Sequence, residues 1–315
     1  MDAGSKAGGT RLWTRRDLLC TAGATLAAGV ASSGLSGCGA AALRPDGRVE
    51  DVPIDAYLSK GCRTMWIAAH PDDECFAGTL LARSRLHWKN PLHFLVMTHG
   101  DGGECCLPEG CRPDLATVRA GEMKQAVALY RASLRHARYW NAPLPVESFP
   151  KRHEIFAKWQ AQGDPVALVT AEIRLFRPDL VLTFDPDFGG TGHPEHQLTS
   201  RIALTAVRRA ADAGVESEGL APHRTGRSYC ILNRFWLLRL AGGADPGPVT
   251  EEFDATLPAL PGQSCAEFMC EATRVHRTQD ADMGLVRRLR GAFLSLSLRQ
   301  VDPFRDGFDP AQPPV

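Results

Sequence analysis

Residues 63–77 read RTMWIAAHPDDECFA, an apolar run that ends abruptly in a cluster of ionisable side chains. Residues 65–69 have the length and composition of a short buried β-strand. Residues 70–74 contain one histidine and three carboxylates, and the apolar spacing that follows indicates a helix. Ligands of open α/β sheets bind at the carboxyl ends of strands, and imidazole with carboxylate suits zinc or another divalent metal. This turn is therefore a candidate metal site.

A second cluster has the same arrangement. Residues 180–184 (LVLTF) form another short apolar run, followed by an acidic, glycine-rich turn and then by residues 192–196 (GHPEH). His193 and His196 are three residues apart at a predicted helix start, so they can share one face. Each cluster alone could arise by chance. Because each follows a strand and opens a helix, the pair indicates a metal site rather than a coincidence.

Predicted strands and helices alternate along the rest of the chain, which favours an α/β fold with a mostly parallel sheet and helices on both faces. Besides the two strands above, the apolar patterns predict strands at 92–98, near 138–140 and at 229–240. Helices are expected at 116–132, 155–176, after His196, at 265–278 and at 280–294.

Four motifs together resemble the PIG-L/LmbE family. They are AHPDDE at 69–74, the Arg-x-x-Glu helix at 119–122, GHPEH at 192–196 and His-x-x-Gln at 276–279. The resemblance implies a single Rossmann-like domain and a zinc-dependent deacetylase of N-acetylglucosamine-type substrates.

The resemblance also assigns roles to the two clusters. His70, Asp73 and His196 are the expected ligands of Zn²⁺ or another divalent metal, with open positions for water and substrate. Asp72 is the expected general base. His193 is expected to stabilise the oxyanion and then to protonate the amine. The alternatives are that Asp72 caps the helix and that His193 supports a metal ligand.

Four further residues are candidate substrate contacts by the same resemblance. Arg119 matches the arginine that contacts the sugar, although a lone helical arginine is otherwise mostly a surface residue. Asp101 and Asn141 stand where the family often has Glu and Asp, and Glu195 also departs from a usual Asp. His276 either returns to the pocket or is an ordinary helical histidine. These departures affect the expected substrate more than the expected reaction.

The N-terminal residues 1–37 resemble a twin-arginine lipoprotein signal peptide. Residues 14–19 (TRRDLL) carry the two arginines, and the small, apolar segment that follows is too short to be a spanning helix. Cleavage before Cys38 would leave a lipidated N-terminus, a linker at 38–60 and the deacetylase domain at 61–315. We expect an exported bacterial lipoprotein of the cell envelope, periplasmic or on the outer face, tethered to the membrane through Cys38. The alternative is a helix that begins a cytoplasmic domain.

The composition of the chain limits the kinds of partner and of cysteine site that we expect. Lys plus Arg and Asp plus Glu are both 36, so nothing favours a nucleic-acid partner. Cys105, Cys106 and Cys111 lie in one loop, and in an exported protein they predict a disulfide between Cys111 and Cys105 or Cys106. A cysteine zinc site is the alternative.

The sequence thus predicts a hydrolase that removes an N-acetyl or other N-acyl group from an amino sugar or glycoconjugate. Export points to envelope glycans, glycolipids or an extracellular N-acyl compound. One alternative is a tethered sugar-binding protein of the same fold that has lost catalysis. A nucleotide-binding enzyme is disfavoured because no G-x-G-x-x-G follows the first strand.

Overall fold

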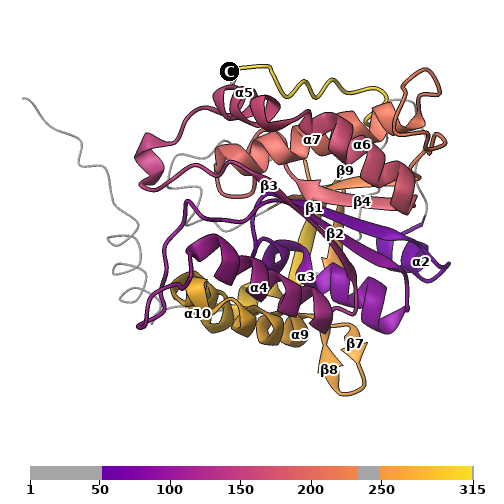
Figure 1. The fold of residues 1–315 in the computed structure, drawn as a ribbon. Helices are drawn as coiled ribbons and strands as arrows, with labels where there is room; N and C mark the ends of the chain where they lie inside the picture. The colour runs from indigo at the N-terminus through magenta and orange to yellow at the C-terminus, as the bar shows by residue number, and fades with distance from the viewer. Residues whose placement is uncertain (1–51, 233–247, 314–315) are drawn as a thin grey trace, which may run out of the picture. The chain divides into compact units, whose positions relative to one another are not determined.

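Seven strands form one sheet in the computed structural model, which describes residues 52–232 and 248–313 (Figure 1). The strand order is β3-β2-β1-β4-β5-β9-β6. The first five strands are parallel, whereas β9 runs antiparallel to β5 and β6 runs antiparallel to β9. The strands are β1 (Thr64–Ala68), β2 (Leu92–Thr98), β3 (Ser133–Tyr139), β4 (Leu180–Phe184), β5 (Arg227–Leu232), β6 (Glu251–Asp254) and β9 (Ser295–Val301).

The central strands are apolar because both faces of the sheet are covered. Every residue of β1, β2 and β4 is buried, as expected for parallel strands between two helix layers. Successive side chains point to opposite faces, so Trp66 and Phe94 belong to one core while Met65 and Leu95 belong to the other.

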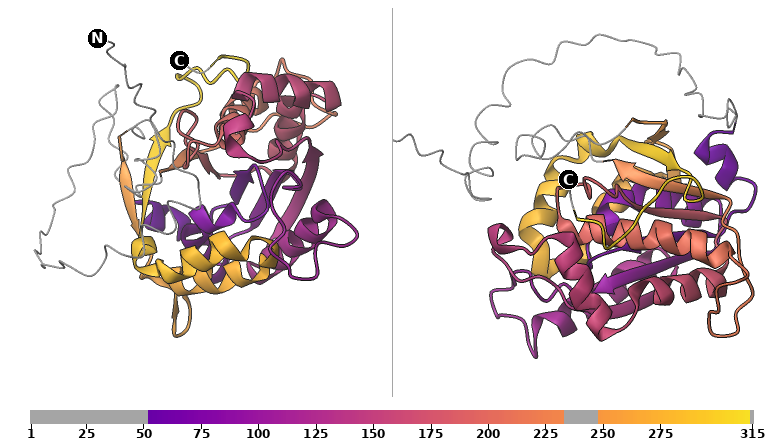
Figure 2. Two further views of the ribbon diagram at one scale, coloured as in Figure 1. Left: turned by 90° about the vertical axis from the view of Figure 1, so that its left-hand side faces the viewer. Right: turned by 90° about the horizontal axis from the view of Figure 1, so that it is seen from above.

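Helices form a layer on each face of the sheet (Figures 1 and 2). One layer contains α3 (Glu74–Ala82), α4 (Leu115–Leu129) and α9 (Cys265–Ala272), with α10 (Asp280–Arg288) packed against α9. The other contains α5 (Arg152–Gln162), α6 (Pro165–Phe176) and α7 (Pro194–Ala211). The chain leaves β1 toward the first layer and leaves the adjacent β4 toward the second. This change of direction between neighbouring strands is where open α/β sheets bind ligands.

The predicted helix at 155–176 is two helices in the structure. The break lies at Gly163, where φ is 143°, a backbone conformation that glycine adopts readily. Asp164 then caps α6 by accepting hydrogen bonds from the amides of Val166 and Ala167, and Pro165 fills the first helical position. The prediction rested on apolar periodicity alone, which placed residues 163–165 inside one continuous helix.

The C-terminal part also differs from the prediction. The helix expected at 265–278 ends at Ala272 and continues as two 3₁₀ turns, and the helix expected at 280–294 ends at Arg288. The antiparallel strand β9 was not predicted. Of the strand expected at 229–240, the residues up to Leu232 belong to β5, and the remainder lies outside the described residues.

The remaining elements are short, and one of them lies in the predicted linker. Residues 54–58 of that linker form α2 (Ile54–Leu58), whose Ile54 and Leu58 are buried in the core. The other short elements are β7 (Pro258–Leu260), β8 (Gln263–Ser264), a π-helical turn at Arg83–His87 and 3₁₀ turns at Val146–Ser148, Thr273–Val275, Arg277–Gln279 and Arg290–Phe293.

The predicted signal peptide and Cys38 lie outside the described residues. Within 52–232 and 248–313, none of the helices combines the length and the apolar character needed to span a membrane.

Candidate metal centre

The turn after β1 presents the carboxylate of Asp73 toward the end of β4. Its Oδ2 accepts hydrogen bonds from the backbone amides of Ala69 (3.0 Å) and His70 (2.8 Å). Its Oδ1 lies 3.0 Å from Nε2 of His196, which is on the first turn of α7. Asp73 is therefore held by its own turn on one oxygen and faces a histidine of α7 with the other.

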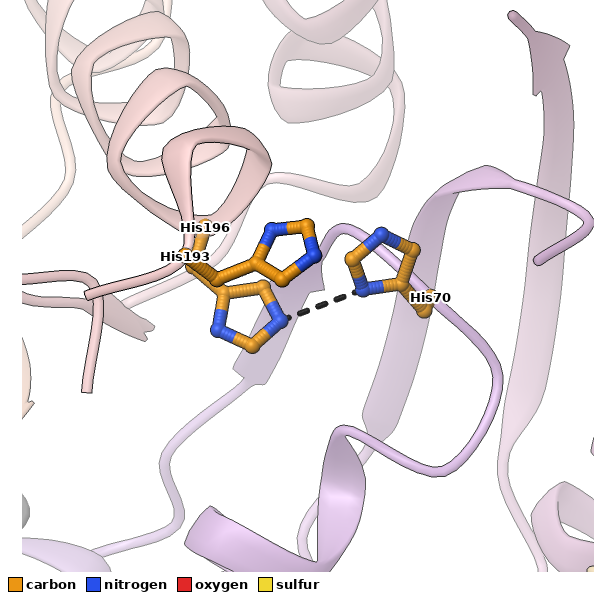
Figure 3. A group of neighbouring side chains, drawn as sticks. All are labelled: His70, His193 and His196. Atoms are coloured by element: carbon orange, nitrogen blue, oxygen red, sulfur yellow. Dashed lines mark hydrogen bonds between the residues drawn. The ribbon is translucent and has the colours of Figure 1, made fainter. Parts of the chain in front are cut away.

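The rings of His70 and His196 face each other across the gap between the two strand ends (Figure 3). Nδ1 of His70 lies 3.1 Å from Nε2 of His196. The other nitrogen of each ring is bound to an oxygen: His196 Nδ1 lies 2.8 Å from the carbonyl of Gly189, and His70 Nε2 lies 2.6 Å from Oε2 of Glu195. An N–H must point at each of these oxygens, so in the neutral rings the two facing nitrogens are lone pairs.

Two facing lone pairs beside a carboxylate form a site that favours a cation. Burial opposes protonation of His70, but the carboxylates of Asp73 and Glu195 outweigh it and raise the pKa of His70 to about 10. The pKa of Asp73 is lowered well below its usual value, because His196 and His70 outweigh the effect of its burial.

The donor atoms also have the spacing that a metal requires. His196 Nε2 lies 3.0 Å from Asp73 Oδ1 and 3.1 Å from His70 Nδ1. The distance of 3.5 Å between His70 Nδ1 and Asp73 is to the other carboxylate oxygen, Oδ2. Ligands of a tetrahedral zinc ion lie about 3.3 Å apart. The structure thus brings the three predicted ligands together, and they fit a divalent metal.

His193 lies next to this set as the N-cap of α7. Its Nδ1 accepts a hydrogen bond from the amide of Glu195 (3.2 Å), which places the proton of the neutral ring on Nε2. Its ring centroid is 4.9 Å from that of His70 and 4.8 Å from that of His196. Ligating atoms of the three histidines lie within 4.8 Å of one another, so His193 is also within reach of a metal.

Asp72 occupies an unusual backbone conformation. Its φ of 91° lies in a region that non-glycine residues rarely adopt, and such outliers concentrate at functional sites. Its Oδ2 accepts a hydrogen bond from Arg119 (3.0 Å) rather than capping α3, which begins after Asp73. Burial raises the pKa of Asp72 to about 6, although the guanidinium of Arg119 acts to lower it. A carboxylate with this pKa is a stronger base than an ordinary one and is still ionised near neutral pH.

Comparison with known proteins places this arrangement in a family. Residues 65–207 match the family model described as "PIG-L: GlcNAc-PI de-N-acetylase". A 1D-myo-inositol 2-acetamido-2-deoxy-alpha-D-glucopyranoside deacetylase from Streptomyces avermitilis is 31% identical over 65% of this chain and 69% of its own. The protein of the same name from Geodermatophilus obscurus is 34% identical, over 69% of this chain and 82% of its own. The chain belongs to the PIG-L family.

Solved structures confirm the PIG-L fold. The N,N'-diacetylchitobiose deacetylase of Pyrococcus horikoshii has a TM-score of 0.55 and 19% identity, covering 78% of this chain and 86% of its own. A 4-carboxy-2-hydroxymuconate hydratase from Pseudomonas putida has a TM-score of 0.56 and 15% identity, covering 76% and 97%. Since one neighbour is a deacetylase and the other a hydratase, the fold does not decide the reaction.

Three of the four predicted substrate contacts of this PIG-L chain are buried and have protein partners. Besides Asp72, Arg119 donates to the carbonyls of Pro71 (2.6 Å) and Gly100 (2.8 Å). The side chain of Asn141 is hydrogen-bonded at both ends, and His276 pairs with Glu74. Asp101 alone among the four is exposed, in the loop after β2. Their roles toward a substrate stay predictions.

The loop after β2 contains one of the two predicted disulfide pairings, Cys105–Cys111, and not the alternative cysteine zinc site. Cys106 is free and exposed. Its backbone amide donates to the carbonyl of Thr278 (3.0 Å), which connects the loop to the C-terminal 3₁₀ turns.

Glu195 and Glu74 have partners that the sequence analysis of this PIG-L chain missed. Glu195 was noted only as a departure from the family motif, yet it contacts His70. Glu74 pairs with His276, which lies 202 residues away. The placement of Glu195 between two site histidines was a signal of a role, but it did not identify the partner.

Proposed function

We propose that this PIG-L protein is a metal-dependent hydrolase that removes an N-acetyl or other N-acyl group from an amino-sugar substrate. The observation that carries the proposal is the joint placement of a fitting ligand set, His70, Asp73 and His196, with Asp72 and His193 beside it. The names of the curated relatives, which are deacetylases of an acetamido sugar, support the substrate class.

The residues of this chain can perform the remaining steps of amide hydrolysis. A divalent metal at the ligand set, with zinc as the first choice, would polarise the amide carbonyl and make a bound water more acidic. Oδ1 of Asp72 accepts the proton of the attacking water, while Arg119 holds the other oxygen of this carboxylate. Nε2–H of His193 donates to the carbonyl oxygen as negative charge develops there and then supplies a proton to the leaving amine. The proton that Asp72 accepted from water replaces it, so the His193 ring ends the reaction neutral.

Two measurements on the purified protein test this proposal. Metal analysis should give about one divalent ion per chain, and a free-amine assay should detect product from N-acetylated amino sugars. A double variant, Asp73→Ala with His196→Ala, should lose both the metal and the product. Glu109→Gln is the matched control, because Glu109 is exposed and pairs with Arg277, which is also exposed. Full metal occupancy in the double variant would overturn the ligand assignment.

The same assay separates catalysis from sugar binding alone. An inactive sugar-binding protein would bind acetylated sugars without releasing amine, even when loaded with metal. Amine release that depends on the metal rules out this alternative.

We also propose that the protein is exported and anchored through a lipid on Cys38, as the sequence motifs indicate. Cys38→Ala should abolish lipidation and leave an unprocessed or released protein. Cys20→Ala, a change within the predicted signal peptide, is the control and should be processed normally. Membrane retention of a processed Cys38→Ala protein would contradict the anchor. An exported enzyme of this kind would act on envelope glycans, glycolipids or extracellular N-acyl compounds.

A further inference from the structure

We propose that Glu195 is a positioning residue for His70 and that Asn141 holds Glu195 in place. This role rests on the proposed metal-dependent function, because it concerns how one metal ligand is oriented. The contacts that carry the proposal form a continuous chain from the backbone of the loop after β2 to Nε2 of His70, the ring nitrogen opposite the proposed ligating one.

Glu195 is fully buried, and donors surround both of its oxygens. Oε2 receives hydrogen bonds from His70 Nε2 (2.6 Å) and from Asn141 Nδ2 (2.7 Å). Oε1 receives one from the amide of Ala142 (2.8 Å). A carboxylate with three donors and no exposed surface is not placed to take a proton from a water at the site. Its contacts are those of a group that orients other residues.

The backbone sets the direction of the Asn141 amide. Its Oδ1 accepts the backbone N–H of Gly102 at 2.6 Å. Since the amide can accept only through oxygen and donate only through nitrogen, this bond leaves Nδ2 facing Glu195. The neutral donor and the carboxylate are therefore complementary, and the Asn141 amide cannot be flipped without breaking its bond to the main chain.

The same logic fixes the His70 ring. With Nε2–H bound to Glu195, the neutral ring presents the lone pair of Nδ1 to Asp73 and His196. Glu195 and His196 are consecutive residues at the start of α7, so one helical turn supplies a ligand and also holds the ligand that comes from β1. Loss of such a supporting carboxylate typically weakens metal binding 10–100-fold.

Glu195→Gln tests the carboxylate with little change in size. A glutamine has one acceptor oxygen and one donor nitrogen, whereas all three partners of Glu195 are donors. If the oxygen faces His70, the nitrogen meets the amide of Ala142, and the reverse orientation sets two donors against His70 and Asn141. No orientation restores the wild-type bonds.

Asn141→Asp tests the support for Glu195. This isosteric change places a second carboxylate about where Nδ2 lies, 2.7 Å from Oε2 of Glu195. Two carboxylates at that distance do not both stay ionised. The proton that they share lowers the negative charge on Oε2 and so weakens its bond to His70, although none of the three proposed metal ligands is altered.

The experiment is a competition titration of the metal-free full-length protein with Zn²⁺ against a chelator, supported by the visible spectrum of the Co²⁺ form. We expect Glu195→Gln to raise the Zn²⁺ dissociation constant roughly 10–100-fold and to change the Co²⁺ spectrum. Asn141→Asp alone should also raise the Zn²⁺ dissociation constant. In a protein that already carries Glu195→Gln it should have little further effect, because Asn141 acts through Glu195. Glu172→Gln, a change on α6 where Glu172 contacts Arg135 and His93, is the matched control.

Wild-type Zn²⁺ affinity in Glu195→Gln would overturn the positioning role. Additive effects of the two changes would overturn the part assigned to Asn141. If Glu195→Gln does not fold, judged by circular dichroism, Asn141→Asp alone decides, and unchanged affinity in it counts against the proposal. These readouts do not involve substrate. A wild-type protein that binds Zn²⁺ tightly but releases no amine therefore contradicts the proposed function and leaves this inference standing.

Discussion

Two turns at the same edge of the sheet differ in almost every physical respect. The turn after β1 has four residues, 70–73, of which all but the partly buried Asp72 are buried. The side chains of His70, Asp72 and Asp73 all have polar partners in other elements. The loop after β2, residues 99–114, is four times as long and largely exposed. A disulfide between Cys105 and Cys111 closes part of it, and backbone bonds tie it to Asn141 and Thr278.

This difference indicates that the two turns have separate tasks, the short turn in the chemistry of the site and the long loop in recognition of the substrate. The short turn fixes the positions of its ionisable groups to within a few tenths of an ångström. Proton transfer and metal binding require this precision. The long loop offers exposed surface at the same edge, which suits recognition of a substrate and tolerates change. We therefore expect changes in the short turn to affect turnover or metal content, and changes in the long loop to affect stability or substrate affinity.

The largest effect is expected from Asp72→Asn in the short turn. This change keeps the size of the side chain and its tolerance of a positive φ, but it removes the proton acceptor. Deacylation should fall roughly 10²–10⁴-fold while the metal content stays at the wild-type value. Glu109→Gln in the long loop is the control and should leave turnover unchanged. Loss of metal in Asp72→Asn would instead make Asp72 a ligand or its support.

His193→Ala should have the next largest effect on turnover. His193 lies in the turn before α7, so this variant adds a third turn to the comparison. Removing the Nε2–H donor should lower turnover on the order of 10²–10³-fold. Metal content, measured on the same preparation, should be retained. A protein that loses its metal would show that His193 is a ligand, which its distance from His70 and His196 allows.

His276→Ala should weaken the support that the C-terminal turns give to the short turn. His276 and Glu74 are both nearly inaccessible, and removing one member of a buried pair costs about 3–5 kcal/mol of unfolding free energy. Urea denaturation measures this loss. Arg277→Ala, next to it on the surface, should change stability by less than about 0.5 kcal/mol.

The same pair gives a pH dependence with a definite sign. Burial opposes protonation of His276, but Glu74 outweighs it and raises the pKa above 6.5. The stabilisation is therefore complete below the pKa of the unfolded histidine and is lost as the pH rises through the raised value. The stability difference between wild type and His276→Ala should shrink as the pH rises above about 6.5, the ordinary pKa of histidine. A difference that grows with pH would contradict the assigned ion pair.

The smallest effect is expected in the long loop. Replacing Cys105 and Cys111 together by serine opens a closed segment with a sequence separation of 6, which should lower the unfolding free energy by about 2 kcal/mol. Metal content should not change, because neither cysteine contacts the ligand set. Cys106→Ser is the matched control. A loss of metal in the double variant would show that the long loop also supports the chemistry.

The sequence predicted those parts of the site that depend on local pattern. The strands β1 and β4 are uninterrupted apolar runs, and each is followed directly by its ionisable cluster, so the alternation of strands and helices was enough to bring His70, Asp73 and His196 to one edge. The pairing of Cys111 was also narrowed to two choices by spacing, and the structure has one of them.

The parts that were not predicted depend on partners distant in sequence or on a short interruption of a helix, such as the one at Gly163. Glu195 and His70 are 125 residues apart, and nothing near Glu195 identifies the ring that it holds. Strand β9 mixes polar and apolar residues (SLSLRQV), and its place beside β5 comes from tertiary packing. The sugar contact of Arg119 stays a prediction, but its partners in the protein could not be predicted, because a motif gives a residue type without its surroundings. In the structure its guanidinium is already bound to Asp72 and two backbone carbonyls.

The positive φ of Asp72 has a consequence for how this chain can diverge. A glycine at position 72 would adopt that conformation without steric cost, so the wild-type residue is less stable there than the simplest replacement. Selection for turnover and selection for stability therefore act in opposite directions on one side chain. A descendant freed from its reaction would be expected to lose this aspartate early, while the buried apolar strands around it persisted.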